Sequence, residues 1–188
     1  MKIKKLAQLC KKNKRVIIYE REIAGTAQVQ QLLSDGAAVY PVFGLPRLTK
    51  ESLLTIFDVD QSEWDKWYVS VYDDPMEEYY LDAMDGEQLL ERFYQPIVKD
   101  GKLIKSVMLN GQTVFFNDAY LDPVRDEKDI MYYGRILNGR TPMIAVKSGL
   151  LLQTTIMPYQ IKDETWIEMM QEMLAGCRCG KQVTDDVD

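Results

Sequence analysis

The sequence predicts an α+β fold made of two similar halves, each a helix followed by three strands, with a further helix after the second half. Three observations predict it. An amphipathic helical segment near the start is followed by three β-rich runs. Residues 16–36 align without a gap with residues 129–149, and strands and turns follow the same order in both. Residues 164–175 again show the helical spacing of apolar side chains.

The composition indicates one folded domain, which we place at residues 1–176. The chain has 188 residues, of which 46% are hydrophobic and 28% charged, a balance that can bury a core. No apolar run approaches the length of about 18 residues that a membrane-spanning helix needs. The start carries lysines without the apolar core of a signal peptide. We therefore expect a cytoplasmic protein that does not engage a membrane.

The first half is predicted at about residues 1–46. Residues 2–13 have a helical apolar stripe formed by Ile3, Leu6, Ala7 and Cys10. Strands are predicted at 16–22, 28–33 and 37–44, because these runs are rich in β-branched and aromatic residues. The tripeptide Ser34-Asp35-Gly36 is a hairpin signal between the second and third strands. Pro41 indicates that the third strand lies at an edge or contains a bulge.

The middle region, residues 47–101, looks like an insertion between the halves. A helix is predicted from Thr49, its N-cap, through LTKESLLTIFDV, and a strand at residues 67–72. A short helix is predicted at residues 85–94. Between Asp58 and Glu91 there are twelve acidic residues and a single basic one. No EF-hand spacing occurs, so we interpret these acids as a solvated surface and not as a metal site.

The second half is predicted at about residues 102–161. Two strands, 102–109 and 112–116, flank Asn110-Gly111, the strongest two-residue hairpin signal in the chain. A short helix at 117–124, limited by Pro123, precedes three further strands. These strands are predicted at residues 129–136, 141–147 and 150–161.

The C-terminal helix, residues 164–175, has a stripe of large apolar side chains. They are Trp166, Ile167, Met169, Met170 and Met173. The stripe either packs onto the body or forms an adaptable interaction face. Residues 177–188 are predicted to be a flexible acidic tail. It carries Cys177 and Cys179, which we interpret as free thiols because no second cysteine pair and no histidine could complete a zinc site.

The internal repeat is carried by aligned strands and turns. Four identities fall within it: Ile17 with Ile130, Tyr19 with Tyr132, Ile23 with Ile136, and Gly36 with Gly149. A unit of this size cannot bury its own apolar face, so two units paired around a shared core are physically sensible.

This arrangement resembles the repeating unit of bacterial DNA sliding clamps, the beta subunit of DNA polymerase III. Phe116-Asn117-Asp118-Ala119-Tyr120-Leu121 is similar to the F-N-x-x-Y-L start of a clamp helix, and residues 142–158 are similar to a closing clamp hairpin that ends in I-M-P. The resemblance covers about residues 1–46 and 102–161. Two features depart from it: the second helix carries no basic residue before Arg125, and a ring needs six such domains, so one chain would have to assemble with copies of itself.

The resemblance implies two sites. In clamps the helices present basic side chains to DNA phosphates, which here implies Lys2, Lys4, Lys5, Lys11, Lys12, Lys14 and Arg15. These residues belong to a stretch of fifteen that carries no acid, although the whole chain has a net charge of −6. The alternative is that they form a solvated helix face. The second site is a pocket for partner peptides at Met157, Pro158, Tyr159, Gln160 and Ile161, where Gln160 replaces the usual basic residue.

We therefore expect a non-catalytic, clamp-like accessory protein that contacts duplex DNA or replication proteins, acts alone or as a homo-oligomer, and uses no cofactor or metal. The alternative is a protein–protein interaction module that never binds nucleic acid and uses the acidic middle region and the Met-rich C-terminal helix. An enzyme is disfavoured. The chain has no histidine for a Ser-His-Asp or Cys-His arrangement, and it has no nucleotide-binding motif.

Overall fold

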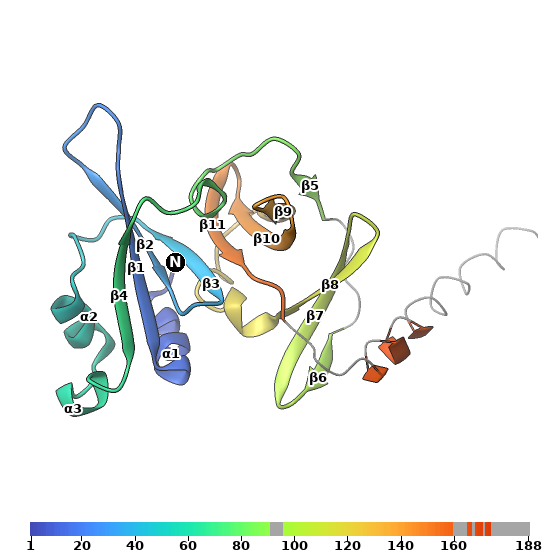
Figure 1. Ribbon diagram of the computed structural model, residues 1–188, viewed down its shortest axis with the longest axis horizontal. Helices are drawn as coiled ribbons and strands as arrows, with labels where there is room; N and C mark the ends of the chain where they lie inside the picture. Colours follow the sequence, from blue (N-terminus) through green and yellow to red (C-terminus); the bar gives the residue numbers. More distant parts are fainter. Residues whose placement is uncertain (91–95, 160–164, 167, 171, 174–188) are drawn as a thin grey trace, which may run out of the picture.

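A computed structural model describes residues 1–90, 96–159, 165–166, 168–170 and 172–173 of the chain (Figure 1). It confirms the α+β class: the chain forms an eight-stranded sheet and a separate three-stranded sheet, with short helices around them. The predicted tail at 177–188, including Cys177 and Cys179, lies outside the described residues.

The first half forms as its local pattern predicts. Helix α1 spans Ile3–Asn13 and is followed by β1 (Arg15–Glu22), β2 (Val29–Ser34) and β3 (Ala38–Val42), which pair as an antiparallel meander. The turn between β2 and β3 is held by Asp35, whose carboxylate accepts hydrogen bonds from the N–H groups of Ala37 and Ala38, each 3.0 Å long. The hairpin signal therefore works through its aspartate as well as its glycine.

One detail of the first half was predicted wrongly. Strand β3 is neither an edge strand nor bulged, because it pairs with β2 on one side and with β11 (Leu151–Ile156) on the other. Its pairing with β11 involves only Ala38 and Val39, so Pro41 lies beyond the shared stretch. A proline that cannot donate a hydrogen bond is tolerated there.

The described part of the middle region contains two short α-helices. Helix α2 (Lys50–Phe57) begins at Thr49, whose side chain accepts a hydrogen bond from the N–H of Ser52, while the Ser52 hydroxyl accepts one from the N–H of Thr49. This reciprocal capping confirms the predicted start. Helix α3 (Gln61–Trp64) follows. Strand β4 (Tyr68–Asp73) then returns to the sheet and pairs with β1 in parallel.

The helix predicted at residues 85–94 is wrong over its described part. Asp85 and Gly86 form a turn, with Gly86 at a φ of +80°, and Gln88–Leu89 form the short strand β5 beside β9 (Ile130–Leu137). Pairing with a distant strand has overridden the local helical pattern. Residues 91–94 of this prediction lie outside the described part of the chain.

The second half contains both its predicted hairpins and a shorter helix than predicted. Strands β6 (Ile97–Lys99), β7 (Lys102–Leu109) and β8 (Gln112–Asn117) form the three-stranded sheet, with left-handed Asn110 and Gly111 at the turn between β7 and β8. The segment predicted as a helix at 117–124 is a single 3-10 turn, η2 (Asp118–Leu121). The meander β9, β10 (Thr141–Ser148) and β11 then returns to the large sheet.

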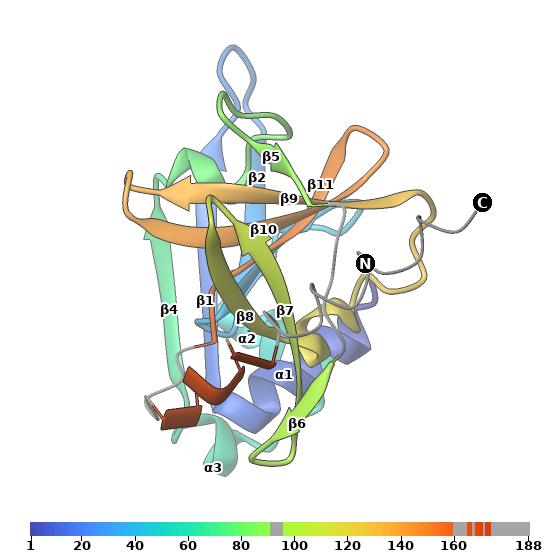
Figure 2. The same cartoon turned by 90° about the vertical axis from the view of Figure 1, so that its right-hand side faces the viewer.

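The two meanders meet in the middle of the large sheet. Its strand order is β4-β1-β2-β3-β11-β10-β9-β5, so the order of one meander mirrors that of the other across the β3–β11 pair. Beneath this junction the buried core draws side chains from both halves, including Leu6 of α1, Tyr40 of β3 and Ile144 of β10. Burying each such side chain contributes about 1.5–3 kcal/mol. Both views place α1 beside η2 (Figure 2).

The C-terminal helix is helical at each described position between 165 and 173. Two members of its predicted apolar stripe pack onto the three-stranded sheet: Trp166 lies against Phe115, with ring centroids 5.6 Å apart, and Met170 is buried beside Ile104 and Phe115. Met169 and Met173 are exposed, and Ile167 lies outside the described residues.

The segment 74–87, which we call the acidic strap, crosses the large sheet between β4 and β5. The strap contains the 3-10 turn η1 (Glu77–Tyr79). Its Glu87 lies between two cations of the second meander: Arg135 Nε donates a 2.6 Å hydrogen bond to one carboxylate oxygen, and Lys147 Nζ lies 2.5 Å from the other. The three side chains are only 9%, 1% and 6% exposed, respectively.

The strap corrects the prediction of a fully solvated acidic surface. Arg135 also donates to the main-chain carbonyls of Glu78 and Leu81, at 2.7 Å each, and the carboxylate of Asp82 accepts from the N–H of Leu152 at 2.8 Å. Buried charges of this kind are stable only when paired and hydrogen-bonded. Part of the acidic middle region therefore neutralises and fastens its own sheet.

Replacing Glu87 with Ala should destabilise the fold strongly, because two buried cations would lose their counter-ion. We expect a loss of about 3–5 kcal/mol in the free energy of unfolding, measured by urea denaturation. The matched control is Glu77→Ala, which removes an exposed carboxylate of η1 and should cost less than about 0.5 kcal/mol. A Glu87→Ala variant as stable as the control would contradict this account of the strap.

Candidate nucleic-acid interface

Helix α1 presents a basic face to solvent because its apolar face is fixed in the core. Leu6, Ala7, Leu9 and Cys10 are buried, while Gln8 between them and the lysines on either side are exposed. Lys14, in the left-handed conformation, ends the helix and donates its N–H to the carbonyls of Cys10 and Lys11. The predicted stripe is confirmed, apart from Ile3, which is only half-buried, and Leu9, which joins it.

The lysines at the start of α1 oppose the helix dipole. The first turn contains no acidic residue and no side chain caps it, whereas Lys4 and Lys5 lie there. Positive charge at a helix N-terminus is unfavourable by roughly the 0.3–1 kcal/mol that negative charge gains there. Lys11 and Lys12, in the last turn, are favourably placed. Helix stability therefore explains the lysines at the end of α1 but not those at its start.

Four of the seven predicted DNA-binding residues are engaged within the protein. Lys2 forms an ion pair with Asp126, and Lys14 forms one with Glu63 at 2.7 Å. The Lys11 ammonium donates to the Asp58 carbonyl at 3.0 Å, and the Arg15 guanidinium lies 5.0 Å from the centre of the Tyr68 ring. These contacts turn the ends of the basic stretch toward neighbouring elements.

Three of the predicted residues have no such engagement. Within the part of the chain that the structure describes, the side chains of Lys4, Lys5 and Lys12 make no ion pair and no hydrogen bond. All three are exposed. Lys5 and Lys12 are seven residues apart, which places them on one side of α1 about 10 Å apart along its axis.

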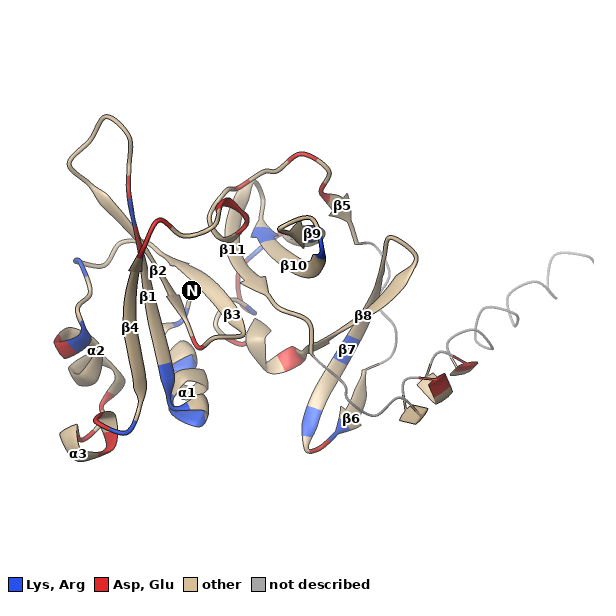
Figure 3. Cartoon of the chain, in the orientation of Figure 1, with Lys and Arg blue, Asp and Glu red and all other residues tan. Residues whose placement is uncertain are grey.

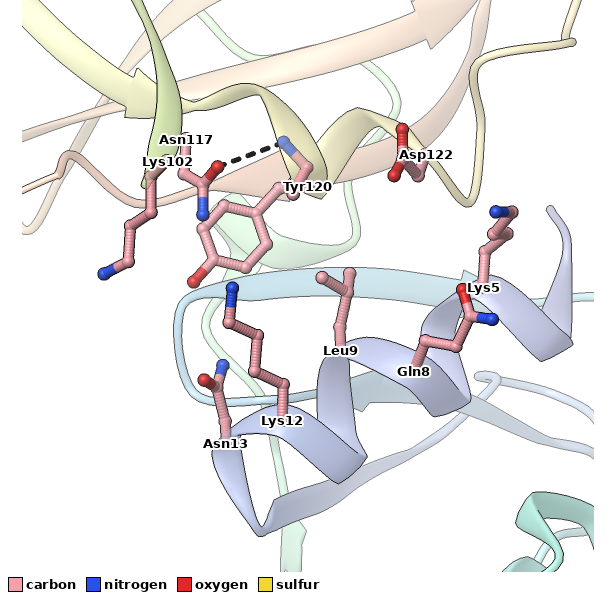
Figure 4. A pocket seen from close by; sticks show the side chains of 10 residues that line it. Lys5, Gln8, Leu9, Lys12, Asn13, Lys102, Asn117, Tyr120 and Asp122 are labelled. Atoms are coloured by element: carbon pink, nitrogen blue, oxygen red, sulfur yellow. Dashed lines mark hydrogen bonds between the residues drawn. The ribbon is translucent and has the colours of Figure 1, made fainter. Parts of the chain in front are cut away.

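A pocket of about 150 Å³ opens beside these two lysines, between α1 and the segment formed by β7, β8 and η2. Figure 4 shows Lys5 and Lys12 on the α1 side and Lys102, from β7, on the other. The polar side chains of Gln8, Asn13, Asn117 and Tyr120 also line it. Asp122 adds an acid near Lys5, but Arg125 pairs with that carboxylate at 2.9 Å. The three lysines therefore give the pocket a positive charge.

The positions of Asn117 and Tyr120 follow from the η2 turn. The Asn117 side chain accepts a 3.1 Å hydrogen bond from the N–H of Ala119, which caps the turn. The Tyr120 carbonyl accepts from the buried Tyr40 hydroxyl at 2.8 Å, which ties the turn to the core. Burial, followed by the charge of Asp35, raises the pKa of Tyr120 to about 12.

Lys102 was not predicted as a site residue. It follows the left-handed turn Asp100-Gly101, and its ammonium lies 4.8 Å from the centre of the Tyr159 ring and 3.5 Å from the Tyr159 hydroxyl. Figure 3 shows the basic residues of β6 and β7 on the side of the molecule that also carries the lysines of α1. Only tertiary structure brings Lys102 to α1, so no local pattern could have indicated it.

The predicted partner pocket is only partly described. Met157, Pro158 and Tyr159 lead from β11 to the three-stranded sheet, where the N–H of Tyr159 donates to the Phe115 carbonyl at 2.6 Å. Tyr159 packs beside Trp166 and Met170, so the chain's own C-terminal helix covers this place. Gln160 and Ile161 lie outside the described residues.

Other chemistry finds little support in the described residues. No group of three or more acidic, cysteine or histidine side chains among them could hold a metal ion, and no helix among them is long and apolar enough to cross a membrane. Burial, followed by the charge of Asp35, raises the pKa of the Cys10 thiol far above its usual range, so this thiol is unreactive.

No protein-family model, curated protein or solved structure matches the chain.

The buried carboxylate of Asp118 joins η2 to β7, and its two neighbours in the sequence, Asn117 and Ala119, line the pocket. Its oxygens lie 2.7 Å from Lys105 Nζ and 2.6 Å from the Arg125 guanidinium. Burial raises the pKa of Asp118, but hydrogen bonds from Lys105 and Arg125 outweigh it, so the pKa lies below its ordinary value. A carboxylate with a lowered pKa stabilises the fold above the unfolded-state pKa of about 3.9 and loses that contribution as the pH falls through its folded-state pKa.

Replacing Asp118 with Asn should therefore lower stability most near neutral pH. The difference in urea midpoint between wild type and Asp118→Asn should be constant from pH 7 to about pH 5. It should shrink below about pH 4, where the carboxylate of the unfolded wild-type chain becomes protonated before that of the folded protein. Urea titrations at a series of pH values measure it. A difference that stays constant down to pH 2.5 would contradict an ionised Asp118 that holds η2 in place.

Proposed function

We propose that this protein is a non-catalytic accessory factor that binds the phosphate backbone of duplex DNA through the exposed face of α1 and the facing Lys102. The observation that carries the proposal is the position of two unengaged lysines of α1, Lys5 and Lys12, which face Lys102 across the pocket. Lys4, also exposed and unengaged among the described residues, lies beside them on α1. Clustered lysines bind phosphates without reading sequence and release condensed counter-ions. The arrangement offers no aromatic platform for unstacked bases on α1, which favours duplex over single-stranded DNA.

The charge distribution supports this proposal. The chain as a whole carries a net charge of −6, which repels anions. A polyanion is therefore attracted only where a basic surface interrupts the negative charge. The acids of the strap lie near β4, β9 and β5, away from α1 (Figure 3). The first turn of α1 also retains Lys4 and Lys5 against the helix dipole, which is easier to explain by binding than by stability.

We also propose that the fold is clamp-like. The mirrored strand order β1-β2-β3-β11-β10-β9 supports a duplicated unit, and the place of η2 beside α1 is where the second helix of such a unit belongs. The second helix is one 3-10 turn without a basic residue, and the facing positive charge comes instead from Lys102 of β7. In this proposal the DNA contact is therefore one helix and one strand, not two helices.

The alternative, an interaction module that never binds DNA, has one favourable observation: Met169 and Met173 of the C-terminal helix are 47% and 58% exposed. Exposed methionines suit an adaptable protein-binding face. The second surface of this alternative, the acidic middle region, is less suited to binding a partner. Glu78, Asp82 and Glu87 of the acidic strap already bind groups of this chain. Our main proposal also includes replication proteins as partners, and Met169 and Met173 would be the surface that contacts them.

The proposal predicts that Lys5→Gln, Lys12→Gln and Lys102→Gln together weaken DNA binding at least tenfold at low salt. The slope of log affinity against log salt concentration should become shallower by about 0.9 per lost phosphate contact. Fluorescence anisotropy with a 5′-labelled duplex of arbitrary sequence measures both quantities.

The control triple variant Lys50→Gln, Lys128→Gln and Arg140→Gln removes the same charge from exposed positions elsewhere. It should keep the wild-type slope. Equal effects of the two triples would mean that only net charge matters, and the proposed interface would be wrong. A wild type that does not bind the duplex even at low salt would support the alternative instead.

A further inference from the structure

Strand β4 is an open edge of the large sheet. It spans six residues and, among the described residues, pairs only with β1. The opposite edge, β5, has two residues, which leaves little to pair with. At β8 the outward carbonyl of Phe115 is already bound by the N–H of Tyr159. Proteins usually protect long edges with lysine, proline or a bulge, and β4 has none of these between Tyr68 and Asp73.

The main-chain groups of β4 that point away from β1 belong to its odd-numbered residues, Val69, Val71 and Asp73. The N–H of Tyr68 donates to the Lys14 carbonyl at 2.9 Å, and the N–H of Asp74 donates to the Glu20 carbonyl at 3.1 Å. Because main-chain groups alternate in direction along a strand, the even-numbered residues face β1 and those of Val69 and Val71 point away from it. These outward groups are available to another strand.

The sequence of β4 reads the same in both directions around its centre: Tyr68-Val69-Ser70-Val71-Tyr72. We propose that a second copy of this chain pairs with β4 in antiparallel fashion, with Ser70 of both copies on the two-fold axis. In this register each Val69 lies opposite the other copy's Val71, and the two exchange both main-chain hydrogen bonds. Each Tyr68 lies opposite the other copy's Tyr72.

The side chains fit this register. Tyr68 and Tyr72 are each 45% exposed and Val71 is 42% exposed, so pairing would cover apolar surface that the single chain leaves in water. Tyr72 already stacks on Tyr19, with ring centroids 6.0 Å apart, so aromatic side chains from both copies would form one layer.

This inference does not depend on DNA binding, although it bears on it. A two-fold axis between antiparallel strands is perpendicular to the sheet, so both copies of a given face lie on the same side. The two α1 helices would therefore lie on one side of a continuous sheet. Failure of the DNA proposal would leave the pairing of β4 untouched, since α1 and β4 are tested by different variants.

A Ser70→Cys variant tests the register. Residues opposite each other in a non-hydrogen-bonded antiparallel pair have Cα atoms about 4.5 Å apart, within the range that a disulfide spans. In a background with Cys177→Ser and Cys179→Ser, mild oxidation should convert most of the Ser70→Cys protein to a disulfide-linked dimer on non-reducing gels. Val98→Cys, at an exposed position of β6, is the matched control and should run as a single chain on the same gels, because no disulfide forms. Equal cross-linking of the two variants would overturn the register.

The molecular mass in solution tests the pairing itself. Light scattering should give twice the mass of one chain for the wild type and the mass of one chain for Val71→Pro, because proline removes an outward N–H and leaves the bonds to β1 intact. Val71→Thr keeps that N–H and should remain dimeric. Thermal unfolding and circular dichroism report whether Val71→Pro is folded. A wild type with the mass of one chain at 100 μM, or a folded Val71→Pro that stays dimeric, would overturn the proposal.

Discussion

The contact between β3 and β11 is the constraint on which the rest of this structure depends. Ala38 and Val39 pair with Ile156 and Thr155, and the Thr154 hydroxyl adds a 2.9 Å hydrogen bond to the Val39 carbonyl. Through this short junction two meanders become one sheet, and neither could bury its apolar face without the other. The shared core beneath the junction fixes α1, and the hydrogen bond between Tyr40 and the Tyr120 carbonyl fixes η2 beside it. The lysine pocket exists because these two elements are held there.

Electrostatics then divides the molecule into two surfaces with different tasks. The acidic strap includes groups turned inward, where Glu87 neutralises Arg135 and Lys147 and holds the strap against β9 and β10. The lysines of the basic stretch lie at the surface. Acidic residues pair with Lys2 and Lys14, whereas Lys4, Lys5 and Lys12 have no acidic partner among the described residues. Internal charge is thus compensated, whereas one patch of positive charge is retained at the surface, which is the physical basis for proposing an anionic partner.

The sequence predicts well what is decided locally. The apolar stripe of α1, the Thr49 cap and the Asn110-Gly111 turn each depend on residues within one or two turns of one another, and the structure confirms them. The sequence predicts less well the features that depend on contacts between residues far apart in the chain. The segment 85–90 has a helical pattern but contains a turn and the two-residue strand β5 because Gln88 pairs with Gly134. Glu87 looks solvated in the sequence, but the sheet brings Arg135 to it. At the site, Lys5 and Lys12 could be predicted from charge, whereas Lys102 could not, because only the fold brings β7 to α1.

The central claim is that the unengaged lysines of α1, with Lys102, form the surface that meets DNA phosphates. Lysine footprinting tests it most directly: the protein is acetylated with and without an excess of duplex DNA, and the reactivity of each lysine is read by mass spectrometry. The account predicts that Lys4, Lys5, Lys12 and Lys102 lose reactivity when DNA is present, while exposed lysines elsewhere, such as Lys50 and Lys128, keep theirs. Unchanged reactivity at all four, or equal protection of lysines across the whole surface, would contradict it.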